Sequence, residues 1–587
     1  MTFIDTLSAI VGGAFEAIDL DRSLGRVKPA DRPDLAQFQC NGAMAAAKQA
    51  RENPRVLADK ICEQLRSHDA FQEVVVAGPG FINLKLENNF VENALAVLAS
   101  DEKLGGWTSP EPEKIIVDYG GPNVAKPLHV GHLRAAIIGE SIKRMMRFTG
   151  NEVVGDVHLG DWGLQMGQLI SEMEIRQPDL VYFDASFEGP YPVEAPISIA
   201  DLEEMYPVAS AACKKDAARA DLARKATKAL QAGRPGYRAL WRHFVDLSVA
   251  AMRIDYDDLG VTFDLWKGES DADPYIPELT EDLQTRGILV ESDGAQIIRV
   301  GREDDKKEFP PIIFLNSEGA VGYHATDIAT IVERKRDIDP GLMLYVVDAR
   351  QRLHFEQVFR AVDLAGYFQE DQMEHLWFGT MNGKDGKPFK TREGGTLKLR
   401  DFIDSLEAKA GERMLEGGVA DGLPADEALQ VKKRVAVAAL KFADLSNPRV
   451  SDYTFDIDRF TAFEGKTGPY LLYAAVRIKS VLAKAKSKGL SASDEISIDG
   501  VEEVDLALRL LSFGDAMREA CGKRSPHILC DHVFALAQVF SKFYAACRIL
   551  DEKDAQRRAS RLRLAELAGQ QLEIGLDLLG VDTPNRM

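Results

Sequence analysis

The sequence predicts a multidomain protein of class α/β plus α, in which a parallel-sheet core is followed by a bundle of helices. From Lys114 a short apolar run, an amphipathic helix and a second apolar run follow one another, which is the order of a parallel βαβ unit. After about residue 400, apolar residues recur at spacings of three and four, which is typical of helices. The length of 587 residues, with 45% apolar and 28% charged residues, gives room for about three or four domains.

Four regions follow along the chain. Residues 1–110 mix helical patterns with the strand-like run VVVAGPGFINLKL and end in the linker-like GGWTSPEPE, so we expect a small α/β domain. Residues 111–400 are the expected parallel-sheet core, with IIVDYG, EVVGDVHLG, IIFLN, LYVVD and HLWFGTM as its strands. Polar helices interrupt this core at about 171–310. We expect a helical connector at 401–460 and a helical domain at 461–587.

Composition argues against several classes of protein. No apolar run approaches the roughly 18 residues of a membrane span, so we expect no membrane partner. The six cysteines are scattered without a C-x-x-C pair, which argues against a zinc cage or a disulfide framework and favours a reducing, cytoplasmic setting. The net charge is -20, yet residues 431–587 carry 24 Lys and Arg against 21 Asp and Glu. This asymmetry fits either a polyanionic ligand or a solvated helical surface.

The first candidate site is GGPNVAKPLHVGHLR, residues 120–134, between the first core strand and its helix. Ligands of open α/β sheets lie beyond the carboxyl ends of the strands, where a helix N-terminus offers N–H groups to phosphate. Pro127 suits the entry to the first turn. His129 and His132 project from one face, and Gly131 permits close approach of a nucleotide. A surface H-x-x-H pair and a zinc half-site are the alternatives, and the zinc site lacks further ligands.

The second candidate site is GKDGKPFKTREGGT, residues 383–396, after the last core strand. Its cations Lys384, Lys387, Lys390 and Arg392 lie among glycines. A positively charged loop of this kind can close over a triphosphate, although taken alone it also fits an ordinary solvated loop. It is not a Walker A loop, because neither GKD nor GKP supplies the hydroxyl that holds magnesium.

These two segments resemble the HIGH and KMSKS signatures of class I aminoacyl-tRNA synthetases. More narrowly, IVDYGGPNVAKPLHVGHLRAAIIGESIKRMMRFTGNEVVGDVHLGDWGLQMGQL is similar to arginyl-tRNA synthetases, as are GFINLKL, YHATDIA, FKTREGGTLKL, TGPYLLYAAVRIKSVL and the final NRM. The resemblance covers nearly the whole chain, least clearly at about 171–310. It implies a Rossmann-like catalytic core with an inserted helical region, an N-terminal domain that contacts tRNA, and a C-terminal helical bundle that binds the anticodon.

The resemblance implies an enzyme that joins L-arginine to tRNA(Arg) for translation in two steps. Arginyl-adenylate forms from arginine and ATP, and the 2′-OH of the terminal ribose of the tRNA then takes the arginyl group. ATP with its accompanying Mg²⁺ is the implied cofactor, no dedicated protein metal site is expected, and the protein is expected to be a cytoplasmic monomer. Two alternatives stay open: another nucleotidyltransferase or adenylating ligase of the HxGH superfamily, and a non-catalytic RNA-binding paralogue.

The resemblance also implies roles for individual residues. A guanidinium needs several acceptors, and unpaired bases need aromatic faces. Thr391 replaces the second Lys of the general KMSKS signature, and Lys126 stands where the family has a compensating Lys. Asp118 stands where many relatives carry Glu, and Gly121 stands where some carry Ser. The implied catalytic residues are Lys126, His129, His132, Lys390 and Arg392. The implied ATP contacts are Pro127, His129, Gly131, His132, Lys387 and Lys390. The implied arginine contacts are Asp118, Asn123, Tyr323, Asp327 and Gln351, and the implied tRNA contacts are Tyr470, Tyr473, Arg477, Tyr544 and Met587.

Overall fold

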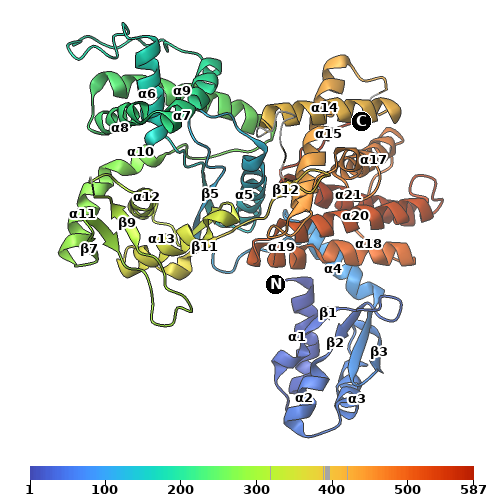
Figure 1. Cartoon of the computed structure of the whole chain (residues 1–587). Coiled ribbons are helices and arrows are strands. Elements are labelled where there is room, and N and C mark those ends of the chain that lie inside the picture. The colour runs from blue at the N-terminus through green and yellow to red at the C-terminus, as the bar shows by residue number, and fades with distance from the viewer. Residues whose placement is uncertain (318, 388, 390–396, 420) are drawn as a thin grey trace. The chain divides into compact units, whose positions relative to one another are not determined.

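The chain forms two compact units in the computed structural model, which describes residues 1–317, 319–387, 389, 397–419 and 421–587 (Figure 1). The first unit comprises Met1–Pro110, Gly411–Phe442 and Phe460–Met587. The second unit comprises Glu111–Ala410 and Ala443–Arg459. No described helix is long and apolar enough to cross a membrane.

The N-terminal part of the first unit is the expected small α/β fold. Its four-stranded antiparallel sheet has the order β1-β2-β4-β3, and β3 and β4 form a hairpin around the GPG turn. α1 begins after Thr2, whose hydroxyl accepts from the Asp5 amide while the Thr2 amide donates to the Asp5 carboxylate. The elements are α1 (Phe3–Glu16), η1 (Arg22–Gly25), β1 (Val27–Pro29), β2 (Phe38–Cys40), α2 (Gly42–Ala50), α3 (Pro54–Leu65), β3 (Phe71–Ala77), β4 (Phe81–Leu86) and α4 (Asn88–Ser100).

The C-terminal part of the chain is helical, as expected from its apolar spacing. α17 starts at Gly468 because the Thr467 hydroxyl caps it by accepting from the Tyr470 amide, and Pro469 occupies its first turn. α17 and α20 both pack against α21, and buried aliphatic side chains fill the space between these helices. The helices are α14 (Leu399–Glu416), α15 (Ala425–Leu445), α17 (Gly468–Ser487), α18 (Val501–Leu511), α19 (Phe513–Gly522), α20 (Pro526–Ala546) and α21 (Ala555–Leu578).

A four-stranded parallel sheet of order β11-β10-β5-β6 forms the centre of the second unit. β5 carries the run IIVDY and is buried over five of its six residues, as a central strand covered on both faces requires. The register sets Asp118 opposite Tyr345 on one side and Asp156 on the other. The sheet elements and their helices are β5 (Lys114–Tyr119), α5 (Val130–Phe148), β6 (Glu152–Asp156), α12 (Tyr323–Asp337), β10 (Leu342–Val346), η3 (Ala349–Gln351), α13 (Arg352–Leu364), η4 (Glu370–Gln372) and β11 (Met373–His375).

The region between α6 and β9 differs in part from the prediction. Its polar stretches are helical, but IIFLN forms β9, which pairs antiparallel with β8 and lies outside the parallel sheet. The prediction of a core strand there was wrong, because a short apolar run does not reveal its partner. The elements are α6 (Leu164–Arg176), α7 (Ile199–Lys215), α8 (Ala217–Gln231), α9 (Pro235–Asp258), α10 (Glu269–Ala272), η2 (Asp273–Tyr275), α11 (Ile276–Thr285), β7 (Leu289–Ser292), β8 (Ala295–Ile298) and β9 (Ile312–Leu315).

The run HLWFGTM is also shorter as a strand than expected. β11 ends at His375, and Phe378 forms only an isolated parallel bridge with Asp348. A strand resumes at Met381, where β12 (Met381–Asn382) pairs in parallel with β13 (Tyr453–Thr454), ahead of α16 (Ile457–Phe460). A buried ion pair stabilises this region, since Arg134 Nε of α5 lies 2.8 Å from Asp444 Oδ1 and both side chains are at most 3% exposed.

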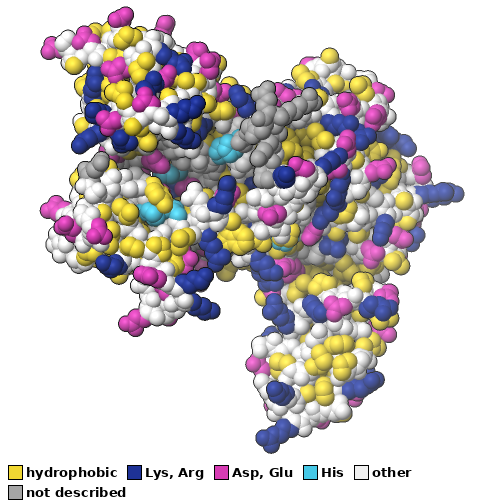
Figure 2. All heavy atoms as spheres, in the orientation of Figure 1, with side chains coloured by type: hydrophobic (Ala, Val, Ile, Leu, Met, Phe, Trp, Pro, Cys, Tyr) yellow, Lys and Arg dark blue, Asp and Glu magenta, His cyan; other side chains and the backbone are white. Residues whose placement is uncertain are grey.

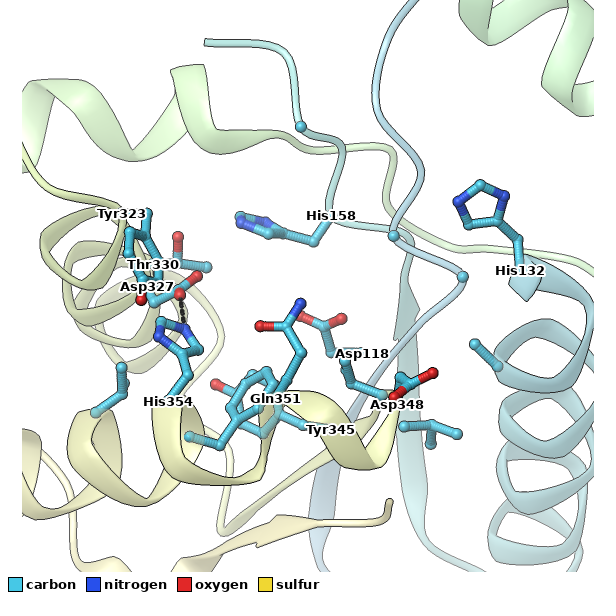
Figure 3. Close-up of a pocket in the computed structure, with 18 of the residues that line it drawn as sticks. Asp118, His132, His158, Tyr323, Asp327, Thr330, Tyr345, Asp348, Gln351 and His354 are labelled. Atoms are coloured by element: carbon cyan, nitrogen blue, oxygen red, sulfur yellow. Dashed lines mark hydrogen bonds and ion pairs between the residues drawn. The ribbon is translucent and has the colours of Figure 1, made fainter. Parts of the chain in front are cut away.

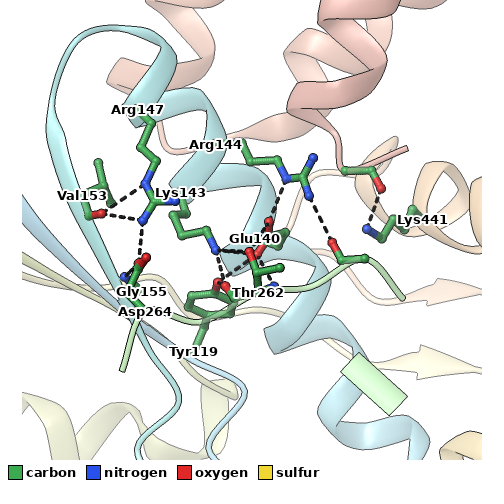
Figure 4. A network of polar contacts seen from close by, with 12 residues as sticks. Tyr119, Glu140, Lys143, Arg144, Arg147, Val153, Gly155, Thr262, Asp264 and Lys441 are labelled. Atoms are coloured by element: carbon green, nitrogen blue, oxygen red, sulfur yellow. Dashed lines mark hydrogen bonds and ion pairs between the residues drawn. The ribbon is translucent and has the colours of Figure 1, made fainter. Parts of the chain in front are cut away.

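A buried polar network fixes β5 against α5 (Figure 4). Glu140 of α5 accepts from the Tyr119 hydroxyl at 2.9 Å and from the Thr262 amide at 3.0 Å, and its carboxylate lies 2.8 Å from Lys143 Nζ. Burial alone would raise the pKa of Glu140, but Lys143, the Thr262 amide and Arg144 lower it to about 2. The carboxylate is therefore charged and paired, and it holds the strand and helix that flank residues 120–129 in a fixed relation.

Candidate functional site

A cavity of about 430 Å³ lies at the carboxyl ends of β5, β6 and β10 in the second unit, and His132, His158 and His354 are among the residues that line it (Figure 3). Histidine side chains are visible on the same face of the molecule in Figure 2. The position is the one expected for a ligand of an open α/β sheet. All five residues predicted to contact arginine line it, together with three residues of the HVGH segment. These eight residues are Asp118, Asn123, His129, Gly131, His132, Tyr323, Asp327 and Gln351.

The two HVGH histidines stack on each other at the start of α5. His129 is the N-cap, and its ring centroid lies 3.8 Å from that of His132. His129 Nδ1 accepts from the Gly131 amide at 3.0 Å, and His132 Nδ1 accepts from the His129 amide at 3.2 Å. A neutral imidazole that accepts at Nδ1 carries its proton on Nε2, so each ring has an Nε2–H to donate. A Cβ at Gly131 would lie 2.7 Å from His129 Cε1, so this position needs glycine for the His129 ring to pack.

Both histidines are neutral near pH 7. Burial lowers the pKa of His129, and the neighbouring Lys126 and Arg350 cations lower it further. Burial, His129 and Lys126 together lower the pKa of His132 to about 3. The pair therefore offers a ligand two neutral donors and no positive charge of its own.

Asp118 is already engaged by a buried arginine of the protein. Arg334 Nη2 donates to Asp118 Oδ2 at 2.6 Å and to Asp156 Oδ2 at 2.7 Å, and the Arg334 side chain is 3% exposed. Burial and the Asp156 carboxylate raise the pKa of Asp118 against the pull of Arg334. Two carboxylates share one guanidinium here, which leaves Asp118 with one oxygen for a ligand.

Tyr323 and Asp327 lie one turn apart in α12, as predicted for a helical pair. The Asp327 carboxylate bonds His354 Nε2, and the ring of Tyr323 stacks on His354 with centroids 4.8 Å apart. Gln351 ends η3 and points into the cavity beside them (Figure 3). Tyr323 is 62% exposed, so it forms the rim of the cavity while Asp327 lies deeper.

Asn123 is held by the chain that follows β6. The Val124 amide donates to Gly160 O at 3.0 Å, and the Gly160 amide donates to Pro122 O at 3.1 Å. A Cβ at Gly160 would lie 2.4 Å from Asn123 Oδ1, so only glycine leaves room for that side chain. The loop after β6 thus sets the position of a residue predicted to contact the substrate.

The predicted cations that the structure describes are not among the residues that line the first cavity. Lys126 and Pro127 line a second cavity, of about 340 Å³, and Lys126 Nζ lies 4.8 Å from the ring centroid of Tyr206 in α7. Pro127 precedes the N-cap of α5, so the prediction that it enters the first turn was wrong. Lys387 is exposed and is not among the described residues that line the first cavity. Lys390 and Arg392 lie outside the described residues.

His158, Glu269 and Arg334 are among the cavity residues that were missed from the sequence. His158 follows β6 at a φ of +38°, and both of its ring nitrogens are buried with no hydrogen-bond partner among the described residues. Burial raises the pKa of Glu269 to about 7, with Asp327 and Asp161 adding to the rise and His158 opposing it. Arg334 lies seven residues after Asp327 and therefore on the same helical face, a spacing that could have revealed it.

Four of the five residues predicted to contact tRNA lie on α17 and α20 in the first unit, and the fifth, Met587, follows α21. The Arg477 guanidinium lies 5.9 Å from the ring centroid of Tyr473 and 5.4 Å from that of Tyr544. Arg477 Nη2 also donates to Ser541 Oγ at 2.6 Å. Tyr473 and Tyr544 are 46% and 40% exposed, whereas Tyr470 packs edge-on against Phe534 and Met587 is half-buried. Two open aromatic faces with a guanidinium between them form a stacking surface.

Comparison with known proteins decides the family. Residues 93–457 match the family described as "tRNA synthetases class I (R), catalytic domain". Residues 471–587 match the "DALR anticodon binding domain", and residues 2–86 match the "Arginyl tRNA synthetase N terminal domain". The chain belongs to the arginyl-tRNA synthetase family.

Arginyl-tRNA synthetases related to this chain match it from end to end. The arginine–tRNA ligase of Maricaulis maris is 53% identical over 584 residues, covering 99% of each chain. That of Hyphomonas neptunium is 53% identical over 587 residues, again covering 99% of each chain. The fold is that of the crystal structure of the Plasmodium falciparum arginyl-tRNA synthetase, with a TM-score of 0.81 at 23% identity, covering 100% of this chain and 99% of that one. The predicted multidomain α/β plus α class is confirmed.

Proposed function

We propose that this enzyme attaches L-arginine to tRNA(Arg) for translation through the residues around the 430 Å³ cavity. The observation that carries the residue assignments is that the HVGH imidazoles and the five predicted arginine contacts, far apart in the sequence, line one cavity. Membership of the family supports the reaction, an ATP-dependent ligation. It gives no support to an unrelated nucleotidyltransferase or a non-catalytic paralogue.

Arginine binds in the acidic half of the cavity. Its guanidinium presents five donors and a fixed positive charge, which Asp327, Tyr323 and Glu269 can meet with oxygen atoms. Asn123 and Gln351 contact the α-amino and carboxylate end, and the free oxygen of Asp118 accepts from the α-amino group. A pocket built from hydrogen-bond acceptors rejects analogues that lack the matching donors by roughly 10⁴- to 10⁵-fold, so we expect no editing step.

ATP binds against the start of α5, with His129, Gly131, His132 and Pro127 beside its phosphates. The arginine carboxylate attacks the α-phosphorus in line, and pyrophosphate leaves. The two Nε2–H groups and the N-terminus of α5 donate to the oxygens on which charge grows. Lys126 and the loop that carries Lys387, Lys390 and Arg392 supply positive charge. Mg²⁺ enters this proposal with ATP, where it neutralises charge on the phosphates.

The terminal ribose 2′-OH of the tRNA then attacks the carbonyl carbon of the adenylate, and AMP leaves. Tyr473, Arg477 and Tyr544 contact anticodon bases, with Tyr470 and Met587 beside them. We expect a monomer that works in the cytoplasm, and its six free cysteines fit a reducing compartment.

Pyrophosphate exchange into ATP tests the proposal. The assay is run with each of the twenty amino acids, with and without tRNA(Arg). We expect exchange with arginine alone among them. Exchange with a different amino acid would overturn the pocket assignment, and no exchange in the presence of arginine and tRNA would favour the non-catalytic alternative.

A further inference from the structure

Residues 397–399 pair with the HVGH segment in a short antiparallel ladder. The Val130 amide donates to Leu397 O at 3.2 Å, and the Leu399 amide donates to Leu128 O at 2.8 Å, so that His129 lies opposite Lys398. His129 is the N-cap of α5, and its ring stacks on His132. The backbone that sets the direction of both imidazoles is thus held by a segment about 270 residues away in the sequence.

Helices α7 and α9, from the insertion, contact the chain just before the ladder on the HVGH side and the ladder residue Lys398 on the other side. On the HVGH side, Lys126 lies over the Tyr206 ring of α7, and the Ala125 amide donates to the Ser248 hydroxyl of α9 at 2.9 Å. On the other side, Lys398 Nζ lies 2.8 Å from Glu203 Oε2 of α7. These contacts surround the 340 Å³ cavity behind the HVGH segment.

Arg400 makes three further hydrogen bonds to α9. Its Nε and Nη2 both donate to Asp255 Oδ1, at 3.0 and 2.6 Å, and its Nη1 donates to Asp258 Oδ2 at 2.6 Å. The two aspartates lie in the last turn of α9. Two carboxylates that bind one planar guanidinium fix the orientation of the arginine side chain as well as its distance from the helix. A single contact to a lysine ammonium group fixes only the distance.

We propose that Arg400, clamped by Asp255 and Asp258, is a positioning residue for the nucleotide site. It anchors the 397–399 strand to α9 and thereby fixes the direction in which His129 and His132 present their Nε2–H groups. The insertion then has a function in catalysis, namely to hold the HVGH segment from behind. This inference rests on the proposed function of the HVGH segment in ATP binding.

The clamp is expected to affect ATP more than arginine. The 397–399 strand bonds to residues 128–130, whereas Tyr323, Asp327 and Gln351 belong to α12 and η3. Asn123 has its own support from Gly160. Loosening the strand therefore displaces the phosphate-facing donors and leaves the arginine contacts in place.

The test is arginine-dependent pyrophosphate exchange by the full-length protein, measured for Arg400→Gln, Arg400→Lys and the double variant Asp255→Asn/Asp258→Asn. We expect Arg400→Gln and the aspartate double variant each to raise the KM for ATP about tenfold, with the KM for arginine within twofold of the parent. Arg400→Lys should recover part of the loss. Adding Arg400→Gln to the aspartate double variant should produce no further rise, because Arg400 acts through these two carboxylates.

Arg336→Gln is the matched control, since it breaks an exposed two-contact pair with Glu278 in the same unit, away from the ladder. Its KM values should equal those of the parent. The proposal is overturned if Arg400→Gln leaves the KM for ATP within twofold, or raises both KM values equally, or if its effect adds to that of the aspartate variant. An inactive parent would instead count against the proposed function. A thermal melt of each variant identifies any that fails to fold, and Arg400→Lys then provides the comparison.

Discussion

His129 and His132 stack with their ring centroids 3.8 Å apart, each accepting a backbone N–H at Nδ1. The geometry makes two aligned Nε2–H donors from a pair of uncharged rings. We therefore expect these two residues to stabilise charge on the transferring phosphate by directed hydrogen bonds, and the lysines and the helix N-terminus to supply positive charge.

Replacing His132 with Asn should lower kcat for pyrophosphate exchange by about 10²- to 10³-fold, the usual cost of losing one preorganised donor. Because the pKa of His132 is about 3, the ring does not titrate between pH 5 and pH 8, so the variant should change the rate and leave the shape of the pH profile unaltered. A step in the parent profile that disappears in His132→Asn would show that the ring works as a cation.

Asp327→Ala should raise the KM for arginine about 100-fold and barely change the KM for ATP, since it removes a charged acceptor from the guanidinium site. Steady-state exchange at varied arginine and at varied ATP measures both constants. Asp337→Ala, at the exposed end of the same helix, is the control and should leave both unchanged. An unaltered arginine KM in Asp327→Ala would refute the pocket assignment.

The ionisation of Glu269 should make arginine binding depend on pH. Burial raises its pKa to about 7, so below pH 7 the side chain is protonated and no longer attracts a guanidinium. The KM for arginine should rise about tenfold as the pH falls from 8 to 6, and arginine should raise the melting temperature more at pH 8 than at pH 6. In Glu269→Gln the KM should be high and flat over this range. A Glu269→Gln variant that keeps the pH dependence of the parent would remove Glu269 from the site.

Tyr473→Ala should weaken binding of tRNA(Arg) about 5- to 150-fold, which corresponds to the roughly 1–3 kcal/mol of one stacked base. Direct titration with tRNA measures the dissociation constant independently of catalysis. Val501→Ala, an exposed apolar residue in α18, is the control and should bind tRNA like the parent. Equal affinity in Tyr473→Ala and Val501→Ala would place the anticodon on another surface.

The sequence predicted the site best where a motif fixes local backbone. HVGH follows β5 and forms the start of α5, and the whole segment 120–134 joins these two elements as expected, because a strand, a short loop and a helix with apolar periodicity leave few other arrangements. The sequence also predicted that Tyr473 and Arg477 lie on one face of a helix, because helical spacing sets which side chains share a face.

The features that the sequence did not reveal depend on contacts between residues that are far apart in the chain. Glu269 carries no local signal, and its raised pKa arises only when folding buries it near Asp327. The neutral state of His132 has the same origin. The prediction placed β9 in the parallel sheet, whereas it pairs antiparallel with β8. Its apolar run is equally suited to either kind of pairing. The ladder between Leu128 and Leu399 is a further case, since neither strand is long enough to be recognised alone.

That ladder also bears on how the protein is made. A ribosome that has just synthesised His129 must add about 270 more residues before Leu397 and Leu399 exist to bond with this segment. At roughly 5–20 residues per second, the nascent chain carries an unpaired edge there for on the order of tens of seconds. Nascent chains arrested before residue 390 should be cut by protease near residue 128, and chains arrested well beyond Arg400 should resist.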